Sequence, residues 1–227
     1  MSVQLKPTAL LAGMATGGLI AAGLIGLGAP AAHAAAGCSD VEVVFARGTD
    51  EPVGVGRVGE AFVDALKSDA KGKTVNVYAV NYPASHDFLK ATEGASDASA
   101  RVRATAAACP DTSIVLGGYS QGAAVIDGIT GDPSALYGLG QPMPPEVANH
   151  IAAVAVFGNP LNRFGGPLTA LSPLYGTKTI DLCNGADPVC SFGADRAAHS
   201  QYVQAGLTRQ AATFVADRLS GRVPSAA

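Results

Sequence analysis

A serine between glycines is the clearest chemical feature of the sequence. Residues 118–122 read Gly-Tyr-Ser-Gln-Gly, a G-x-S-x-G pattern that directly follows an apolar run at 114–116 and opens a segment rich in Ala, Val and Ile. A strand, a sharp turn and a helix in this order form a nucleophile elbow, whose glycines keep side chains out of a strained turn. We therefore predict that Ser120 is a catalytic nucleophile at the positive end of a helix; a chance Gly-Ser pattern is the alternative.

A serine hydroxyl needs a base that takes its proton, and three histidines follow the N-terminal region. In α/β-hydrolases the chain order is serine, acid, histidine. His86 precedes Ser120, and His150 precedes the best acid candidates, so we predict that His199 is the base. A histidine of no consequence at the start of the last helix is the alternative.

The acid should lie between these two residues, where the candidates are Asp127, Asp132, Glu146, Asp181, Asp187 and Asp195. Asp127 falls in a predicted helix, Asp181 in a predicted strand, and Asp195 lies very close in sequence to the histidine. Asp187 instead follows a strand, in the loop Cys-Asn-Gly-Ala-Asp-Pro-Val-Cys at 183–190. There it would fix the imidazole tautomer and stabilise the imidazolium. A plain Asp-Pro turn is the alternative.

An oxyanion hole needs donors that point at the developing negative charge. The backbone N–H of Gln121, the residue after the nucleophile, is the first expected donor. The second should come from a loop after an early strand, and Phe-Ala-Arg-Gly-Thr-Asp-Glu at 45–51 fits, with Thr49 supplying its N–H and its hydroxyl. A Gly-containing surface turn is the alternative for that loop.

The elements that must position these residues alternate between strand and helix patterns. Apolar runs predict strands at 41–46, 75–80, 113–116, 151–157 and 177–182, and spacing or composition predicts helices at 58–66, 91–108, 123–129 and along an amphipathic stripe at 203–219. Val- and Ile-rich strands separated by helices indicate a parallel sheet covered on both faces. The Gly- and Pro-rich segment 131–145 is typical of a surface loop, so we expect one three-layer α/β domain.

Residues 1–34 are typical of a signal peptide. Lys6 is the only charged side chain before Asp40, a long apolar run follows it, and Ala-His-Ala at 32–34 is a small-x-small site of the kind that signal peptidase cuts. We expect cleavage after Ala34 or Ala36 and a secreted mature domain, 35–227, with or without attachment to the cell wall. An uncleaved anchor is the alternative, because the run is long enough to span a bilayer. No second such run follows, so we expect no stable membrane insertion of the mature chain.

The composition excludes several classes of protein. The 227 residues include 15 Lys and Arg against 18 Asp and Glu, a net charge of −3, which argues against a nucleic-acid partner. With 48% hydrophobic and 15% charged residues, the chain is unlike a disordered one. Four cysteines in an exported chain predict two disulfides, for which three pairings are possible. The gap between Cys183 and Cys190 is too wide for a usual zinc motif.

A second motif suggests a different class of protein, a nucleotide binder. Residues 54–59 read Gly-Val-Gly-Arg-Val-Gly, a literal G-x-G-x-x-G ahead of a predicted helix. The motif lies several residues past the first strand, however, and the second strand ends at Asn81 and Tyr82 with no acidic residue to hold a ribose. We therefore interpret it as a Gly-rich connection.

Taken together, these residues resemble the cutinase family of small, lidless serine esterases, and most of all the cutinase-like proteins of mycobacteria and related actinobacteria. The resemblance rests on residues 45–51, on Gly-Gly-Tyr-Ser-Gln-Gly-Ala-Ala at 117–124, on the loop 183–190 and on the histidine shortly after it. It covers the chain from Cys38 onward. It implies an α/β-hydrolase fold with a central five-stranded parallel sheet, helices on both faces, and the disulfides Cys38–Cys109 and Cys183–Cys190.

The same resemblance implies the chemistry of the site. The nucleophile would be Ser120, the base His199 and the acid Asp187, with Thr49 and Gln121 as oxyanion donors; some relatives carry Ser at the position of Thr49. The activity would be hydrolysis of carboxylic esters of short to medium acyl chains, and sometimes of longer lipids or polyesters, through an acyl-enzyme. No metal or organic cofactor is expected.

Other functions stay open on sequence alone. The elbow also suits an acetylxylan esterase, a phospholipase or a thioesterase, because fold and triad do not set the acyl pocket. A secreted protein that binds the cell wall without catalysis is the non-enzymatic alternative. Phe88, Leu89 and Phe192 fall on loops near the predicted site, where they would contact an acyl chain or form a small packing cluster. We expect an ester or lipid substrate and a monomer.

Overall fold

Five parallel strands form the central sheet of the structure, a computed structural model that describes residues 37–132 and 141–222. They are β1 (Val41–Ala46), β2 (Val75–Ala79), β3 (Ser113–Tyr119), β4 (Ile151–Phe157) and β5 (Thr179–Leu182), in the order β2-β1-β3-β4-β5. In register, Val44 pairs with Tyr78 on one side and with Leu116 on the other. The three central strands are almost entirely buried, which explains why most of their residues are apolar.

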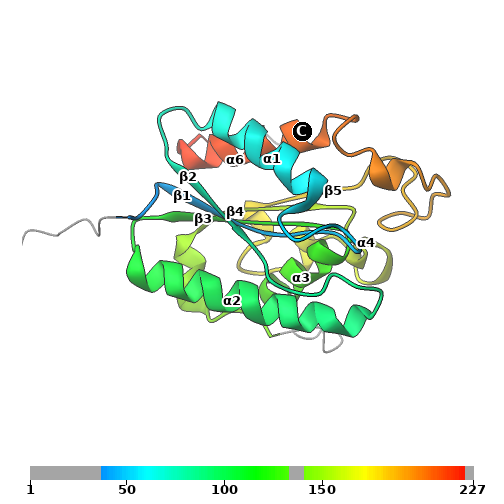
Figure 1. Cartoon of the computed structure of the whole chain (residues 1–227), viewed down its shortest axis with the longest axis horizontal. Coiled ribbons are helices and arrows are strands. Elements are labelled where there is room, and N and C mark those ends of the chain that lie inside the picture. The colour runs from blue at the N-terminus through cyan, green and yellow to red at the C-terminus, as the bar shows by residue number, and fades with distance from the viewer. Residues whose placement is uncertain (1–36, 133–140, 223–227) are drawn as a thin grey trace, which may run out of the picture. The chain divides into compact units, whose positions relative to one another are not determined.

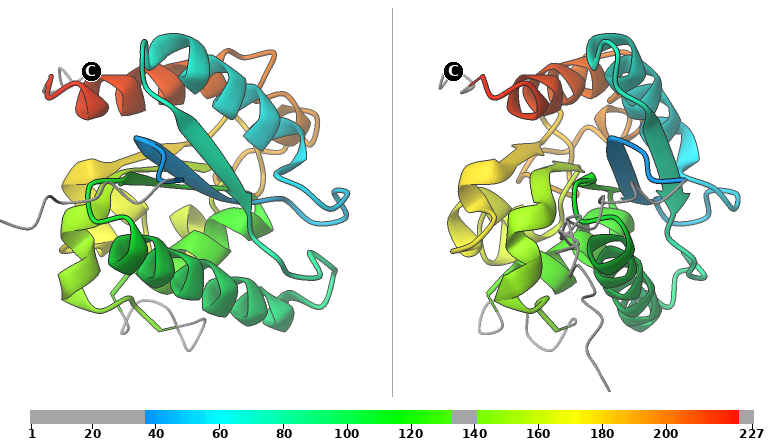
Figure 2. Two further views of the ribbon diagram at one scale, coloured as in Figure 1. Left: turned by 60° about the vertical axis from the view of Figure 1, so that its left-hand side comes forward. Right: turned by 90° about the vertical axis from the view of Figure 1, so that its left-hand side faces the viewer.

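Helices cover both faces of this sheet (Figures 1 and 2). Helices α1 (Gly56–Asp69) and α6 (Leu207–Leu219) pack on one face, and α2 (Ala91–Ala108) and α3 (Gln121–Thr130) pack on the other. Side chains alternate along β1, so that Val43 and Phe45 join the core under α1 and α6, whereas Val44 and Ala46 join the core under α2 and α3. The predicted three-layer α/β fold is confirmed.

Short helices occupy the connections between these elements. They are η1 (Phe88–Lys90), η2 (Pro145–His150), α4 (Leu161–Phe164), α5 (Leu168–Leu171), η3 (Gly176–Lys178) and η4 (Ala198–Ser200). Three of them, η1, α4 and η4, follow the strands β2, β4 and β5 along the chain. They therefore belong to the carboxyl edge of the sheet, where parallel α/β sheets bind their ligands.

Several predicted elements have boundaries that differ from those observed, and three of these differences have a visible structural reason. Strand β3 continues to Tyr119, beyond its predicted end at 116, because Gly117 leaves room for a ring; a Cβ there would lie 2.4 Å from Phe45 Cδ2. Strand β5 starts at Thr179, since the residues before it form η3. The last helix starts at Leu207 rather than near 203, because Gly206 adopts a left-handed φ of 75° and ends the preceding turn.

Two disulfides close loops of very different length. Cys38–Cys109 joins residues 71 positions apart, and Cys183–Cys190 joins residues 7 positions apart. These are the pairs that the family resemblance implied. Each has a Cα–Cα distance of 5.7 Å, which lies within the usual range for a disulfide.

Two sequence predictions fall outside the described residues. These are the signal peptide, residues 1–34, and the part of the predicted surface loop at 133–140. Across 37–132 and 141–222, no helix combines the length and the apolar character that crossing a membrane demands.

Candidate active site

Ser120 lies at the sharp turn between β3 and α3, with a φ of 55° and a ψ of −117°. Glycine alone adopts a positive φ without strain, so the surrounding turn must hold the serine in this conformation. A Cβ on Gly118 would lie 2.2 Å from the carbonyl oxygen of Gly122, and a Cβ on Gly122 would lie 2.0 Å from that of Ala46. Both glycines are therefore required by close backbone packing, and the turn has the geometry of a nucleophile elbow.

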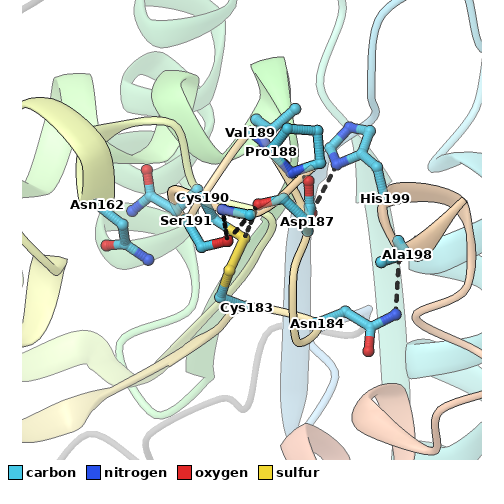
Figure 3. The surroundings of a disulfide bond; sticks show 12 residues. Asn162, Cys183, Asn184, Asp187, Pro188, Val189, Cys190, Ser191, Ala198 and His199 are labelled. Carbon is cyan, nitrogen blue, oxygen red and sulfur yellow. Dashed lines mark hydrogen bonds and ion pairs between the residues drawn. A yellow bond between two sulfur atoms is a disulfide. The ribbon is translucent and has the colours of Figure 1, made fainter. Parts of the chain in front are cut away.

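Three side chains that the sequence predicted to act together form a hydrogen-bonded row. The Oγ of Ser120 lies 3.0 Å from Nε2 of His199, and Nδ1 of the same ring lies 2.8 Å from Oδ2 of Asp187. Figure 3 shows the Asp187–His199 pair beside the short disulfide. An imidazole between a hydroxyl and a carboxylate can take the hydroxyl proton while the carboxylate fixes its tautomer and stabilises its charge. The row can therefore activate a serine for acyl transfer.

Asp187 is fully buried, and its carboxylate has hydrogen-bond donors on both oxygens. The backbone N–H of Val189 donates to Oδ1 at 2.8 Å, and the hydroxyl of Tyr202 donates to Oδ2 at 2.6 Å. Such donors offset the large cost of taking a carboxylate out of water. The Cys183–Cys190 bridge closes the loop that carries this residue, so the carboxylate is held in one position (Figure 3).

Neighbouring groups also fix the position of His199. The ring of Tyr119 stacks on the imidazole with centroids 5.1 Å apart, and its hydroxyl donates to the His199 carbonyl oxygen. Burial raises the pKa of Tyr119 to about 12, so this hydroxyl keeps its proton at neutral pH. Asp195 accepts the backbone N–H groups of Ala197 and Ala198 through Oδ1, at 2.9 and 3.3 Å. It therefore caps the turn that carries the histidine.

The two predicted oxyanion donors contact each other beside the nucleophile. Oγ1 of Thr49 donates to Oε1 of Gln121 at 3.3 Å, and Nε2 of Gln121 donates to the carbonyl oxygen of Ser85 at 3.0 Å. Gln121 is the first residue of α3, so its backbone N–H belongs to the free N-terminal turn of that helix. The side chain of Gln121 thus joins the loops after β1 and β2 around the site.

A mostly apolar cavity of about 660 Å³ opens at the nucleophile. All three apolar residues predicted near the site are exposed; Phe88 lines this cavity, whereas Leu89 and Phe192 are not among its lining residues. Leu161 and Phe164 of α4 also line it, and the sequence analysis missed them. Their position directly after β4, at the carboxyl edge of the sheet, is the signal that could have identified them.

The other two histidines are not bonded to the nucleophile. His86 lines the cavity, but its Nε2 lies 2.7 Å from Oδ2 of Asp50, and both of these side chains are largely exposed. His150 ends η2, directly before β4. The serine, acid, histidine order therefore selected the ring that Ser120 contacts.

The G-x-G-x-x-G motif at 54–59 has a different role from the one that its pattern suggests. Oε1 of Glu51 accepts the N–H of Arg57 at 2.9 Å, and its Oε2 accepts the N–H of Gly48 at 2.7 Å. A Cβ on Gly56 would lie 2.1 Å from Oε2 of Glu51. The protein's own carboxylate therefore fills the N-terminus of α1, where a nucleotide phosphate would have to lie.

Comparison with known proteins identifies the family of this chain. The Cutinase family model matches residues 37–219. The chain belongs to the cutinase family. It is 56% identical over 186 residues to the Mycobacterium tuberculosis protein named "Phospholipase Culp4", an alignment that covers 82% of this chain and 81% of the relative. It is 53% identical over 199 residues to the Mycobacterium bovis protein named "Carboxylesterase Culp1", with coverages of 85% and 87%.

Solved structures show the same relationship. A Trichoderma reesei cutinase in complex with a C11Y4 phosphonate inhibitor has a TM-score of 0.64 and 31% identity, over 80% of this chain and 77% of that chain. The catalytic core domain of acetyl xylan esterase from Trichoderma reesei has a TM-score of 0.69 and 25% identity, over 80% and 99%. This cutinase-family protein is a carboxylic ester hydrolase with the α/β-hydrolase fold.

Proposed function

We propose that this cutinase-family protein hydrolyses carboxylic esters through an acyl-enzyme on Ser120, with His199 as the base and Asp187 as the acid. The observation that carries the proposal is the hydrogen-bonded row of these three side chains, at 3.0 and 2.8 Å, beside an apolar cavity. The family membership supports the same reaction class.

The reaction would proceed in two halves. The Oγ of Ser120 forms a bond to the ester carbonyl carbon while Nε2 of His199 takes its proton. The resulting oxyanion accepts hydrogen bonds from Gln121 N–H and from Thr49, and its collapse breaks the bond to the alcohol, which leaves with the proton from the imidazole. Water then attacks the acyl-enzyme in the same way, and the carboxylic acid leaves as Ser120 regains its proton.

The acyl part of the substrate would occupy the apolar cavity. Phe88, Leu161, Phe164 and Val189 contribute its apolar walls, and its volume of about 660 Å³ lies within the range of small-molecule sites. These walls support short to medium acyl chains as the substrate class. Rates on p-nitrophenyl esters of increasing chain length measure this preference, and a rate that only falls from acetate onward would contradict it.

Labelling with a fluorophosphonate tests the nucleophile directly. We expect one covalent adduct per molecule, on Ser120, and loss of both adduct and ester hydrolysis in Ser120→Ala. Ser68→Ala, which changes an exposed serine of α1, is the matched control and should keep both. A purified wild-type protein that neither hydrolyses esters nor takes up the label would instead support the non-catalytic wall-binding function.

The Thr49 hydroxyl can be tested by a pair of variants. Thr49→Val keeps the shape of the side chain and removes the hydroxyl, and we expect kcat to fall by about 10²-fold, as for loss of one oxyanion donor. Thr49→Ser keeps the hydroxyl and should stay close to wild type. Equal kcat values for both variants would leave only the backbone N–H of Thr49 in the oxyanion hole.

Phospholipid hydrolysis is the second candidate function, favoured by the 56% identity to a relative named a phospholipase. Likeness to an acetyl xylan esterase structure makes acetylated xylan a third substrate to compare. Release of fatty acid from phosphatidylcholine, measured beside p-nitrophenyl butyrate and acetylated xylan, ranks the three by kcat/KM. The Ser120→Ala variant is the blank in each assay.

We further propose that the mature protein, residues 35–227, is a secreted, monomeric, single-domain enzyme whose signal peptide is removed. Two disulfides among the described residues support an oxidising compartment outside the cytosol. N-terminal sequencing of the protein from culture medium should begin at residue 35 or 37. Light scattering after gel filtration should give the mass of one chain; retention of residues 1–34 in a membrane fraction would indicate the uncleaved anchor.

A further inference from the structure

Tyr202 is a buried residue that the reaction scheme does not use. It lies between η4 and α6 and is fully buried, and its hydroxyl donates to Oδ2 of Asp187 at 2.6 Å. Nδ1 of His199 contacts the same oxygen at 2.8 Å. We propose that Tyr202 is a positioning residue of this esterase, whose hydroxyl orients the Asp187 carboxylate toward the imidazole and shares its negative charge. This proposal rests on the proposed catalytic function of Ser120, His199 and Asp187.

The surroundings of Tyr202 leave its hydroxyl with little freedom. The oxygen accepts the backbone N–H of Asn184 at 3.2 Å and lies 3.3 Å from Sγ of Cys190. The ring packs edge-on against Phe157, with centroids 6.1 Å apart. A Cβ on Gly158 would lie 3.0 Å from the Tyr202 oxygen, so a larger residue there would crowd it. The hydroxyl proton is thereby directed to the carboxylate.

The protonation state of Tyr202 suits a permanent donor. Burial, together with the hydrogen bond to Asp187, raises the pKa of this phenol well above its ordinary value of 10. The hydroxyl therefore keeps its proton wherever the protein is folded and active. Unlike an arginine, it places no full positive charge beside the imidazole, which has to become positive during the reaction.

Removal of this donor has a definite electrostatic consequence. Without the Tyr202 hydroxyl, more of the carboxylate charge would act on the His199 ring, and the protonated imidazole would be held more tightly. The base would then become available only at higher pH. The carboxylate would also be free to turn away from the imidazole, which lowers kcat without a large effect on substrate binding.

Other charged groups near the two rings come from separate elements. Arg57 of α1 donates to the carbonyl oxygen of Ser200, and Asp195 accepts the backbone N–H groups that precede His199. Glu51 and Arg57 both act electrostatically on Tyr119, which stacks on the imidazole. A Tyr202→Phe substitution leaves these charged groups in place. A shift in the pH profile of ester hydrolysis would therefore reflect the change at Asp187.

The test is the pH dependence of ester hydrolysis in Tyr202→Phe, with Tyr119→Phe as the matched control. Both variants remove a buried tyrosine hydroxyl whose ring packs against His199, but only the first removes a donor to Asp187. For Tyr202→Phe we expect kcat to fall about tenfold, KM to stay within about twofold, and the acid limb to move up by about half a pH unit or more. The control should not displace this limb, whatever its kcat.

A second measurement does not depend on turnover. The proton that Nδ1 of His199 shares with Asp187 should give a downfield NMR signal, and Tyr202→Phe should move it while Tyr119→Phe should not. An acid limb and an NMR signal that both coincide with wild type in a folded Tyr202→Phe variant would overturn the positioning role. Absence of wild-type ester hydrolysis would contradict the proposed function instead, and the NMR comparison would still decide whether Tyr202 acts on Asp187.

Discussion

Two regions of this molecule each combine a disulfide with a buried carboxylate, one near the start of the sheet's strands and one after their ends. At the first, Glu42 of β1 lies beside Cys38–Cys109 and is bonded to Nε of Arg101 and, at 3.0 Å, to Oγ1 of Thr105. At the second, the buried Asp187 lies in the loop closed by the short disulfide and contacts His199 and Tyr202. Both residues are at most 3% exposed.

The difference between the two regions lies in their partners rather than in burial. An arginine stays charged at all relevant pH values, so the Glu42 pair can only join β1 to α2. A histidine can exchange a proton near neutral pH, so in the proposed reaction His199 would pass on the proton taken from Ser120. Burial of a carboxylate therefore indicates a need for donors, and the type of donor decides whether the group serves stability or chemistry.

The largest expected contrast is in activity. Asp187→Asn should lower kcat on p-nitrophenyl butyrate by about 10⁴-fold, because an amide favours the wrong imidazole tautomer. Glu42→Gln is the matched change at the other region and should keep kcat within about twofold at 25 °C. Stopped assays at equal concentrations of folded protein measure both. A small loss in Asp187→Asn would assign the role of the acid to another residue.

Removal of each disulfide should affect stability in the opposite order, with the larger loss at the region of Glu42. Removal of the long bridge by Cys38→Ser with Cys109→Ser should lower the free energy of unfolding by about 4 kcal/mol, and removal of the short one by Cys183→Ser with Cys190→Ser by about 2.5 kcal/mol. Only the second pair should also reduce kcat, since that bridge closes the loop of Asp187. Urea unfolding and ester hydrolysis on the same samples separate the two effects. Equal kcat losses in both pairs would contradict the comparison.

Glu42→Gln should have a smaller but measurable effect on stability. The substitution leaves the hydrogen bonds partly in place and removes the charge that faces Arg101, so the free energy of unfolding should fall by about 1–3 kcal/mol. Glu60→Gln, at an exposed position on α1, is the control and should fall within about 0.5 kcal/mol of wild type. A Glu42→Gln protein as stable as wild type would mean that the pair contributes no net stability.

A third buried carboxylate, that of Asp127, extends the comparison. Its side-chain partner is an asparagine rather than an arginine or a histidine. Nδ2 of Asn159 donates to Oδ1 of Asp127 at 3.3 Å and to Oδ2 of Asp181 at 3.0 Å. Among the residues that the structure describes, Oδ2 of Asp127 has no hydrogen-bond partner. Burial, and after it repulsion from Asp181, raises the pKa of Asp127 well above its ordinary value of 3.8, against a smaller lowering by Asn159. Folding therefore favours the protonated form of Asp127.

The smallest expected effect is a pH dependence of stability. Because the pKa of Asp127 is raised in the folded state, its contribution is complete below 3.8 and is lost as pH rises through the raised value. Asp127→Asn cannot ionise, so its free energy of unfolding should fall less than that of wild type as pH rises from 4 upward. Some slope should remain, since burial also raises the pKa of Asp181. Urea unfolding at several pH values measures this difference, with Asp64→Asn, at an exposed position, as control. The prediction would be contradicted if the free energy of unfolding changed with pH in the same way in both variants.

Much of the fold was predictable because buried segments are rich in apolar residues, which the sequence shows directly. The strands at 41–46 and 151–157 and the helix at 91–108 have the predicted boundaries. The end of β3 was predicted too early, because Gly117 has a low strand propensity and only the ring of Phe45 explains it. Phe164 and Leu161 were missed, because two apolar residues in a short helix carry no periodic pattern.

The sequence by itself determined the order of strands and helices, the elbow around Ser120 and the types of side chain that could act with it. The sequence favoured Asp187 among six candidate carboxylates, but only the tertiary structure shows the contacts that join the three side chains, because hydrogen bonds act over about 3 Å while Ser120 and His199 lie 79 residues apart in the chain. The role of Tyr202 also belongs to the tertiary structure. A tyrosine in a polar loop has no sequence signature of its own, and its position is fixed by the packing of β4, η4 and the short disulfide loop around Asp187.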